Sequence, residues 1–111
     1  MMEKEVFNFK EAMERIGDEE LIFELLEDIV ELADATEEQL KVAIETNNMT
    51  EVRIAGHTLK GTAANLALPQ LSEVGKAFDT AARNNDSSNL EELFKDLQQA
   101  VINFKQFLAD R

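Results

Sequence analysis

The chain has 111 residues, no cysteine and a formal net charge of −12. A chain of this length (residues 1–111) is expected to form one small domain with a single core. The absence of cysteine excludes a disulfide framework. A strongly acidic protein repels the phosphate backbones of DNA and RNA, so the composition argues against nucleic-acid binding.

No apolar run in the chain is longer than three residues. A membrane span needs about 20 such residues, and the core of a signal peptide needs about 7 to 15. The acidic start, Glu3 to Glu5, also lacks the basic flank of a secretory signal. We therefore expect a cytoplasmic protein that does not associate with membranes. Met1 and the lack of a linker favour a free-standing chain.

A mildly basic island interrupts the acidic chain between residues 53 and 83. Its net charge is +2, from four cationic side chains and two carboxylates (Arg53, Lys60, Lys76 and Arg83 against Glu73 and Asp79). Such an island suits a local anionic group and is too small to indicate DNA or an anionic membrane as the partner. Ordinary variation on a solvated surface is the alternative interpretation.

Apolar residues recur at three- and four-residue spacing along almost the whole chain, which predicts helices. The expected helices cover residues 9–16, residues 19–46, residues 49–66, the stretch from Pro69 to a polar loop at residues 84–87, and the stretch from Ser88 to about Ala109. Gly17 is expected to end the first helix, and Asp18 to cap the second.

Two sequence patterns indicate capping boxes at helix starts. The first, Thr36 to Gln39, predicts a break or kink near residues 34–36. The second, Ser88 to Glu91, predicts the start of the last helix. Short connections between helices of this length favour antiparallel neighbours. We therefore expect an all-α fold, an antiparallel up-down four-helix bundle with an additional short N-terminal helix.

The helix predicted over residues 49–66 carries His57, the only histidine. At about 100° per residue, its apolar residues cluster within roughly 80° of arc, and His57 falls about 160° from the centre of that stripe. The stripe consists of Val52, Ala55, Leu59, Ala63 and Leu66. His57 is therefore expected to face solvent rather than the core. An incidental surface histidine remains the alternative interpretation.

Two cations flank His57 on this helix, Arg53 four residues before it and Lys60 three residues after it. Gly61, four residues after His57, costs about 1 kcal/mol relative to alanine inside a helix. We interpret Gly61 as clearance that lets another protein approach the imidazole. Ile54 and Ala64, on the same exposed side, would form a small apolar rim for docking.

A surface histidine between cations suits phosphoryl transfer. Histidine has a reference pKa of about 6.5, so a neutral ring nitrogen is available at pH 7 to attack phosphorus. Transfer then needs mainly in-line positioning and neutralisation of charge. Lys60 is expected to supply part of that neutralisation, and a partner the receiving aspartate and magnesium.

The segment from Ala55 to Leu66, AGHTLKGTAANL, resembles the signature of histidine-containing phosphotransfer domains, H-x-L-K-G followed by small residues. Phe78-Asp79 and Ala82-Arg83 are similar to that family's downstream leucine-glutamate and alanine-arginine elements. Gly56, Ala67 and Asp79 depart from the commonest residues of the pattern. We expect these departures to affect packing and helix ends more than transfer.

The resemblance implies a four-helix bundle in which His57 is phosphorylated on its outward ring nitrogen. It implies the stabilising role for Lys60, the clearance role for Gly61, and a position for Arg83 near the phosphoryl group. The implied function is a phosphorelay intermediate, a monomer without kinase activity or a cofactor of its own. It would take the phosphoryl group from a receiver-domain aspartate or a histidine kinase and pass it to another receiver aspartate.

The implied partners are response-regulator receiver domains and a sensor or hybrid histidine kinase, with magnesium in the receiver.

Three other functions are alternatives to this phosphorelay role. In an enzyme, His57 would act as a general base, with Asp79 as the one nearby carboxylate to orient it. A metal site would need a second histidine or a cysteine, and the sequence has neither. A helical interaction bundle that is never phosphorylated is the serious alternative.

Overall fold

The computed structural model describes residues 4–111, so Met1 and Glu3 of the acidic start lie outside the described residues. The described chain contains five helices and no strand, which confirms the all-α prediction. The helices are α1 (Phe9–Ile16), α2 (Glu19–Glu45), α3 (Met49–Asn65), α4 (Pro69–Arg83) and α5 (Leu90–Asp110). Their bounds agree with the predicted helices to within about two residues.

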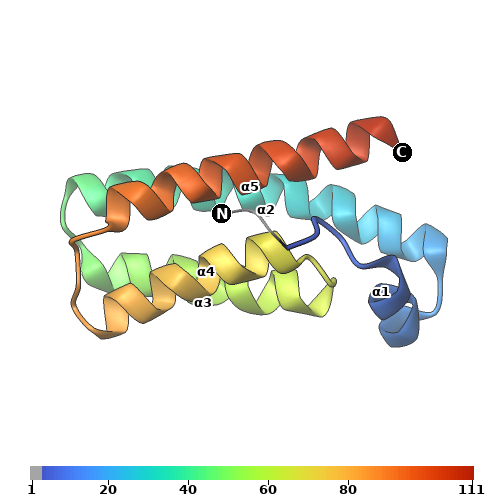
Figure 1. Ribbon diagram of the computed structural model, residues 1–111, viewed down its shortest axis with the longest axis horizontal. Coiled ribbons are helices and arrows are strands. Elements are labelled where there is room, and N and C mark those ends of the chain that lie inside the picture. Colours follow the sequence, from blue (N-terminus) through green and yellow to red (C-terminus); the bar gives the residue numbers. More distant parts are fainter. Residues whose placement is uncertain (1–3) are drawn as a thin grey trace.

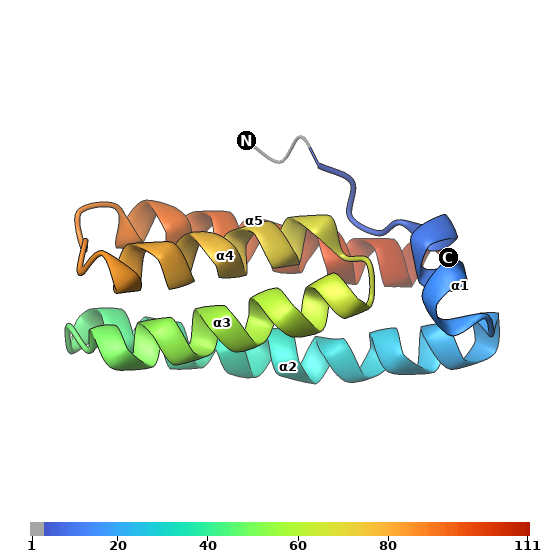
Figure 2. The same cartoon turned by 90° about the horizontal axis from the view of Figure 1, so that it is seen from below.

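Helices α2 to α5 run up and down along the longest dimension of a body that measures 41 × 24 × 23 Å (Figure 1). α3 and α4 lie side by side and share the most extensive helix–helix contact, while α5 packs against both α2 and α4. The short α1 lies across one end of the bundle, next to the start of α2 (Figure 2). The antiparallel four-helix bundle with an additional N-terminal helix is therefore confirmed.

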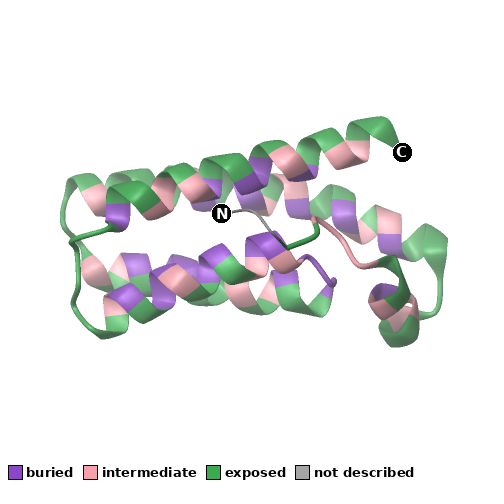
Figure 3. Ribbon diagram, viewed as in Figure 1, coloured by how far each residue is buried: buried purple, intermediate pink, exposed green. Residues whose placement is uncertain are grey.

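The predicted apolar stripes form the core between the four long helices (Figure 3). Every residue of the stripe predicted on α3 is buried, including Leu66, which follows the last residue of the helix. The aromatic rings of Phe78 from α4 and Phe104 from α5 are fully buried among these aliphatic side chains. Burial of such side chains is worth about 1.5–3 kcal/mol each, which makes the inward faces the main stabilising feature of the bundle.

Three local signals at helix ends act as predicted. Gly17 ends α1 with a φ of 77°, a left-handed conformation that glycine adopts without steric cost. The side chain of Asp18 accepts a hydrogen bond from the backbone nitrogen of Leu21 at 3.2 Å, capping α2. Pro69 is the first residue of α4, where its missing N–H costs nothing.

The predicted break near residues 34–36 is wrong, because α2 is one continuous helix of 27 residues. Thr36 is only 2% exposed and lies on the same buried face as Ala33 and Leu40. A capping box would have required residues 34–36 to leave the helical conformation and carry Thr36 out of that face. Burial of the face therefore outweighs the local capping signal.

The second predicted capping box is also wrong. Asn89 is the N-cap of α5 and makes no side-chain capping bond. The backbone nitrogen and the hydroxyl of Ser88 both donate to Oδ1 of Asp86, at 3.0 and 2.6 Å. Ser88 is thus engaged in the preceding turn and is not available to cap the helix.

Contacts from α1 and the residues before it hold the end of α3. Ala67, just after α3, has a φ of 56°, and its carbonyl oxygen accepts a hydrogen bond from the backbone nitrogen of Asn8 at 2.9 Å. Arg15 of α1 donates to the carbonyl oxygen of Ala64. This departure from the family pattern at Ala67 accordingly concerns a helix end, as predicted.

Candidate functional site

His57 lies in the middle of α3 with a side chain that is 61% exposed. The predicted solvent-facing position is therefore confirmed. Its Nδ1 atom lies 3.4 Å from Oδ2 of Asp79 on α4. This is a long hydrogen bond, since N–H···O bonds are usually 2.7–3.2 Å. One ring nitrogen is thus turned towards the bundle.

Asp79 is the centre of a charged cluster between α3 and α4. Its side chain is only 4% exposed. Oδ2 also lies 3.3 Å from Nζ of Lys60, and Oδ1 accepts a hydrogen bond from Nε of Arg83 at 3.0 Å. The expectation that Asp79 affects packing more than the transfer site is therefore wrong, because this carboxylate contacts His57, Lys60 and Arg83 together.

The ionisation of Asp79 follows from two opposed effects. Burial would raise the pKa of its carboxyl group, but the hydrogen bonds from His57, Lys60 and Arg83 and the charge of Arg83 outweigh burial. The pKa of Asp79 is therefore lower than usual, and the group is a carboxylate near neutral pH. An ionised carboxylate can only accept hydrogen bonds. Of the two tautomers of a neutral imidazole, it consequently favours the one with the proton on Nδ1 and the lone pair on Nε2.

A groove beside His57 brings together most of the predicted docking residues. It is lined by residues of α3, α4 and the loop that follows α4: Met49, Thr50, Arg53, Ile54, His57, Thr58, Ala82, Arg83 and Asn85. Arg53 and Ile54 are exposed, so the groove presents positive charge and apolar surface together. Its lining contains two arginines and no carboxylate side chain.

The other three predicted residues of the face, Lys60, Gly61 and Ala64, lie outside the lining of this groove. Gly61 is exposed, and a Cβ atom built on it would meet nothing within 4 Å. The space that the clearance interpretation requires is therefore present. Ala64 is also exposed, but lies nearer α1, whose Arg15 contacts its carbonyl oxygen.

Two glycines lie beneath the site: Gly56, whose expected role in packing is confirmed, and Gly75, which the sequence did not single out. Gly56 and Gly75 are buried where α3 and α4 cross, next to the backbones of Asp79 and Lys60. The sequence contained one signal for them, since glycine inside a helix is costly unless it serves close packing. Finding which surface each glycine packs against required the tertiary structure.

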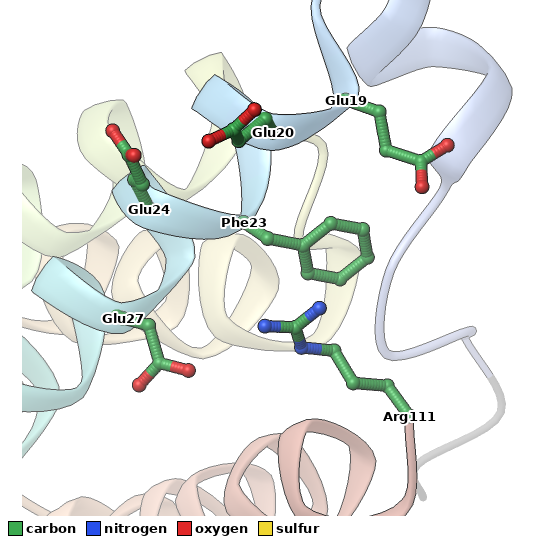
Figure 4. Close-up of a pocket in the computed structure, with 6 residues that line it drawn as sticks. All are labelled: Glu19, Glu20, Phe23, Glu24, Glu27 and Arg111. Carbon is green, nitrogen blue, oxygen red and sulfur yellow. The ribbon is translucent and has the colours of Figure 1, made fainter.

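A second depression has the opposite charge (Figure 4). Four glutamates from the first turns of α2 surround the ring of Phe23, and the guanidinium of Arg111 lies 4.2 Å from the centre of that ring.

Among residues 4–111, no group of three or more acidic, histidine or cysteine side chains is arranged to hold a metal ion. Within the same residues, no helix has the length and apolar character needed to cross a membrane.

The family model of the Hpt domain matches residues 24–107. This chain belongs to the Hpt domain family. The match covers most of the chain and confirms the resemblance found in the segment around His57. No curated protein and no solved structure matches the chain. Hpt domains are histidine phosphotransfer modules of two-component phosphorelays. They generally act as phosphocarriers rather than enzymes, and generally interact with receiver domains and histidine kinases.

Proposed function

We propose that this Hpt domain is a phosphorelay intermediate that carries a phosphoryl group on Nε2 of His57. It receives the group from a receiver-domain aspartate or a histidine kinase and passes it to another receiver aspartate. The observation that carries the proposal is the exposed imidazole whose Nδ1 faces a buried carboxylate 3.4 Å away. That arrangement leaves the lone pair of Nε2 on the outward side of the ring.

The transfer step balances without a base from this chain. Nε2 of neutral His57 attacks the phosphorus of an aspartyl phosphate, the N–P bond forms, and the O–P bond breaks with its electron pair returning to the carboxylate. The ring keeps its proton on Nδ1 and becomes positively charged. The carboxylate of Asp79 stabilises that charge, and donation to the next receiver reverses the same steps.

The cations around His57 support the phosphoryl group in this proposal. Lys60 stands one turn from His57, 35% exposed, with its ammonium held near Asp79. Arg83 is 50% exposed and lines the groove, as does Arg53. Positive charge close to His57 stabilises the dianionic phosphoryl group and so favours the phosphorylated ring over the unphosphorylated one.

The partner supplies the rest of the chemistry. Receiver domains dock over the groove and Gly61, and the receiver contributes the magnesium ion. The monomeric state and the cytoplasmic location of this chain remain predictions. This chain is proposed to have no kinase activity of its own. The clearance at Gly61 and the apolar side chain of Ile54 would let the receiver aspartate reach in-line distance.

The test is transfer of labelled phosphate from a phosphorylated receiver domain to the parent and to His57→Gln. The parent should acquire a label that is lost in acid and kept in base, as a phosphoramidate requires. His57→Gln should acquire none, although its circular dichroism and melting temperature stay close to those of the parent. An equally labelled variant, or a parent that no receiver or kinase labels, would favour a bundle that only binds other proteins.

A further inference from the structure

α3 and α4 meet at two buried glycines, Gly56 and Gly75. A Cβ atom on Gly56 would lie 2.8 Å from the backbone nitrogen of Asp79 and 2.8 Å from the carbonyl oxygen of Gly75. A Cβ atom on Gly75 would lie 2.6 Å from the backbone nitrogen of Lys60. Backbone atoms cannot rotate aside as side chains do, so either methyl group would force the helices apart.

The atoms that meet at this crossing belong to residues of the site. Gly56 directly precedes His57, and the backbone it approaches is that of Asp79, the partner of the imidazole. Gly75 approaches the backbone of Lys60, the other group that contacts Oδ2 of Asp79. The distance between α3 and α4 is therefore set directly beneath His57, Lys60 and Asp79, whose side chains interact between the two helices.

Asp79 has little reach to spare at this spacing. Its Oδ2 atom is 3.4 Å from Nδ1 of His57 and 3.3 Å from Nζ of Lys60, both near the upper limit for a hydrogen bond. Aspartate is one methylene shorter than glutamate, so it can span only a narrow gap between helices. A further separation of roughly half an ångström would break both contacts.

We propose that Gly56 and Gly75 are positioning residues, whose missing side chains let α4 bring the carboxylate of Asp79 within reach of His57 and Lys60. The glycines act through Asp79 and do not touch the phosphoryl group. The expected effect on the rate of phosphoryl transfer rests on the proposed function. The expected effect on the tautomer of the His57 ring does not.

The first measurement is ¹⁵N NMR of the His57 ring in unphosphorylated Gly56→Ala. With Asp79 out of reach, the ratio of Nδ1-protonated to Nε2-protonated ring should fall by at least about fivefold from that of the parent. Gly61→Ala is the matched control for this measurement. It makes the same substitution on the same helix, where the new Cβ meets nothing within 4 Å, so the ratio should stay unchanged.

Replacing Asp79 with glutamate separates positioning from a merely structural effect. In Gly56→Ala, the longer side chain of Asp79→Glu should span the widened gap and restore the tautomer ratio. It should also recover most of an expected loss of about tenfold in the transfer rate from a receiver. In the parent, the same Asp79→Glu change moves the carboxylate by one methylene from its position between His57 and Lys60 and should lower both quantities. Thr80→Ala, an exposed neighbour on α4, should leave both unchanged.

The proposal is overturned by an unchanged tautomer ratio in Gly56→Ala or by the absence of rescue by Asp79→Glu. If Gly56→Ala does not fold, Gly75→Ala replaces it in the same scheme. If neither folds, Asp79→Glu in the parent decides, with a lowered ratio supporting the proposal and an unchanged ratio refuting it. A parent that shows the expected tautomer but accepts no phosphoryl group would refute the proposed function and leave this inference standing.

Discussion

Two surface depressions of this Hpt domain differ in charge and in what lies at their centre. The groove beside His57 is lined by Arg53 and Arg83 and contains no carboxylate side chain. The depression at the start of α2 is lined by four glutamates, and the cation within it, Arg111, comes from the chain itself (Figure 4). An anionic phosphoryl group is stabilised in the first environment and repelled in the second.

The difference shows that the net charge of −12 does not describe the surface that a phosphoryl group meets. Within about 10 Å, the screening distance at moderate salt, local side chains dominate the potential. Around His57 those side chains are the cations Arg53, Lys60 and Arg83, with the buried carboxylate of Asp79 between α3 and α4. Most of the negative charge lies elsewhere, on exposed positions such as those of α2.

Among variants that keep His57, the largest effect is expected from Gly61→Gln, which adds bulk beside His57 without touching the core. Transfer from a receiver domain should fall about 100-fold, because the added side chain keeps the reacting atoms beyond in-line distance. The free energy of unfolding should stay the same or rise by several tenths of a kcal/mol, since glutamine is the better helix former.

The control for this variant is a small phosphodonor, which needs no protein-sized approach. If such a donor labels the parent, it should label Gly61→Gln almost as well. Normal exchange of the folded variant with receivers would contradict the clearance role of Gly61, even though His57 could still carry the group.

Charge reversal gives a direct comparison of the two depressions. Arg53→Glu should slow association with a receiver domain about tenfold at low ionic strength, and the difference should shrink as salt is added. Glu24→Lys, in the acidic depression, is the matched variant and should change the rate by less than about twofold. Stopped-flow association over a range of salt concentrations measures both. Similar effects of the two changes would mean that overall charge, and not the groove, guides the partner.

Lys60→Ala should have a smaller effect, because the receiver's own cation and magnesium supply much of the neutralisation. We expect transfer in both directions to slow by roughly threefold to tenfold. The lifetime of phosphorylated His57 should shorten as well, and Lys60→Arg should retain most of both properties. Equal rates and lifetimes in Lys60→Ala and the parent would rule out this role.

The smallest effect is a dependence of stability on pH through Asp79, whose pKa is lower in the folded protein than in the unfolded chain. Its contribution is fully present above the unfolded pKa of about 3.9 and is lost as the pH falls through the lower, folded value. Asp79→Asn should therefore be less stable than the parent by about 1 kcal/mol at pH 7. Urea unfolding at several pH values should show that difference shrinking as the pH falls below about 4. A difference that stays constant over this range would mean that the charge of Asp79 stabilises nothing.

The sequence by itself determined the five helices, the antiparallel bundle and the outward position of His57. These properties depend on the three- and four-residue spacing of apolar side chains, which each helix carries in its own sequence. The same spacing identified the buried stripe of α3 correctly. Local capping patterns were reliable at Gly17 and Asp18, where no burial competes with them.

Only the tertiary structure decided which groups surround the imidazole. Asp79 lies 22 residues from His57 in the chain, and its contact depends on how closely α3 and α4 approach at Gly56 and Gly75. The continuity of α2 through Thr36 was likewise decided by burial against the other helices, which outweighed a valid local signal. Periodicity specifies which face of a helix is buried, but the distance to the neighbouring helix depends on the side chains that both helices bring to their contact.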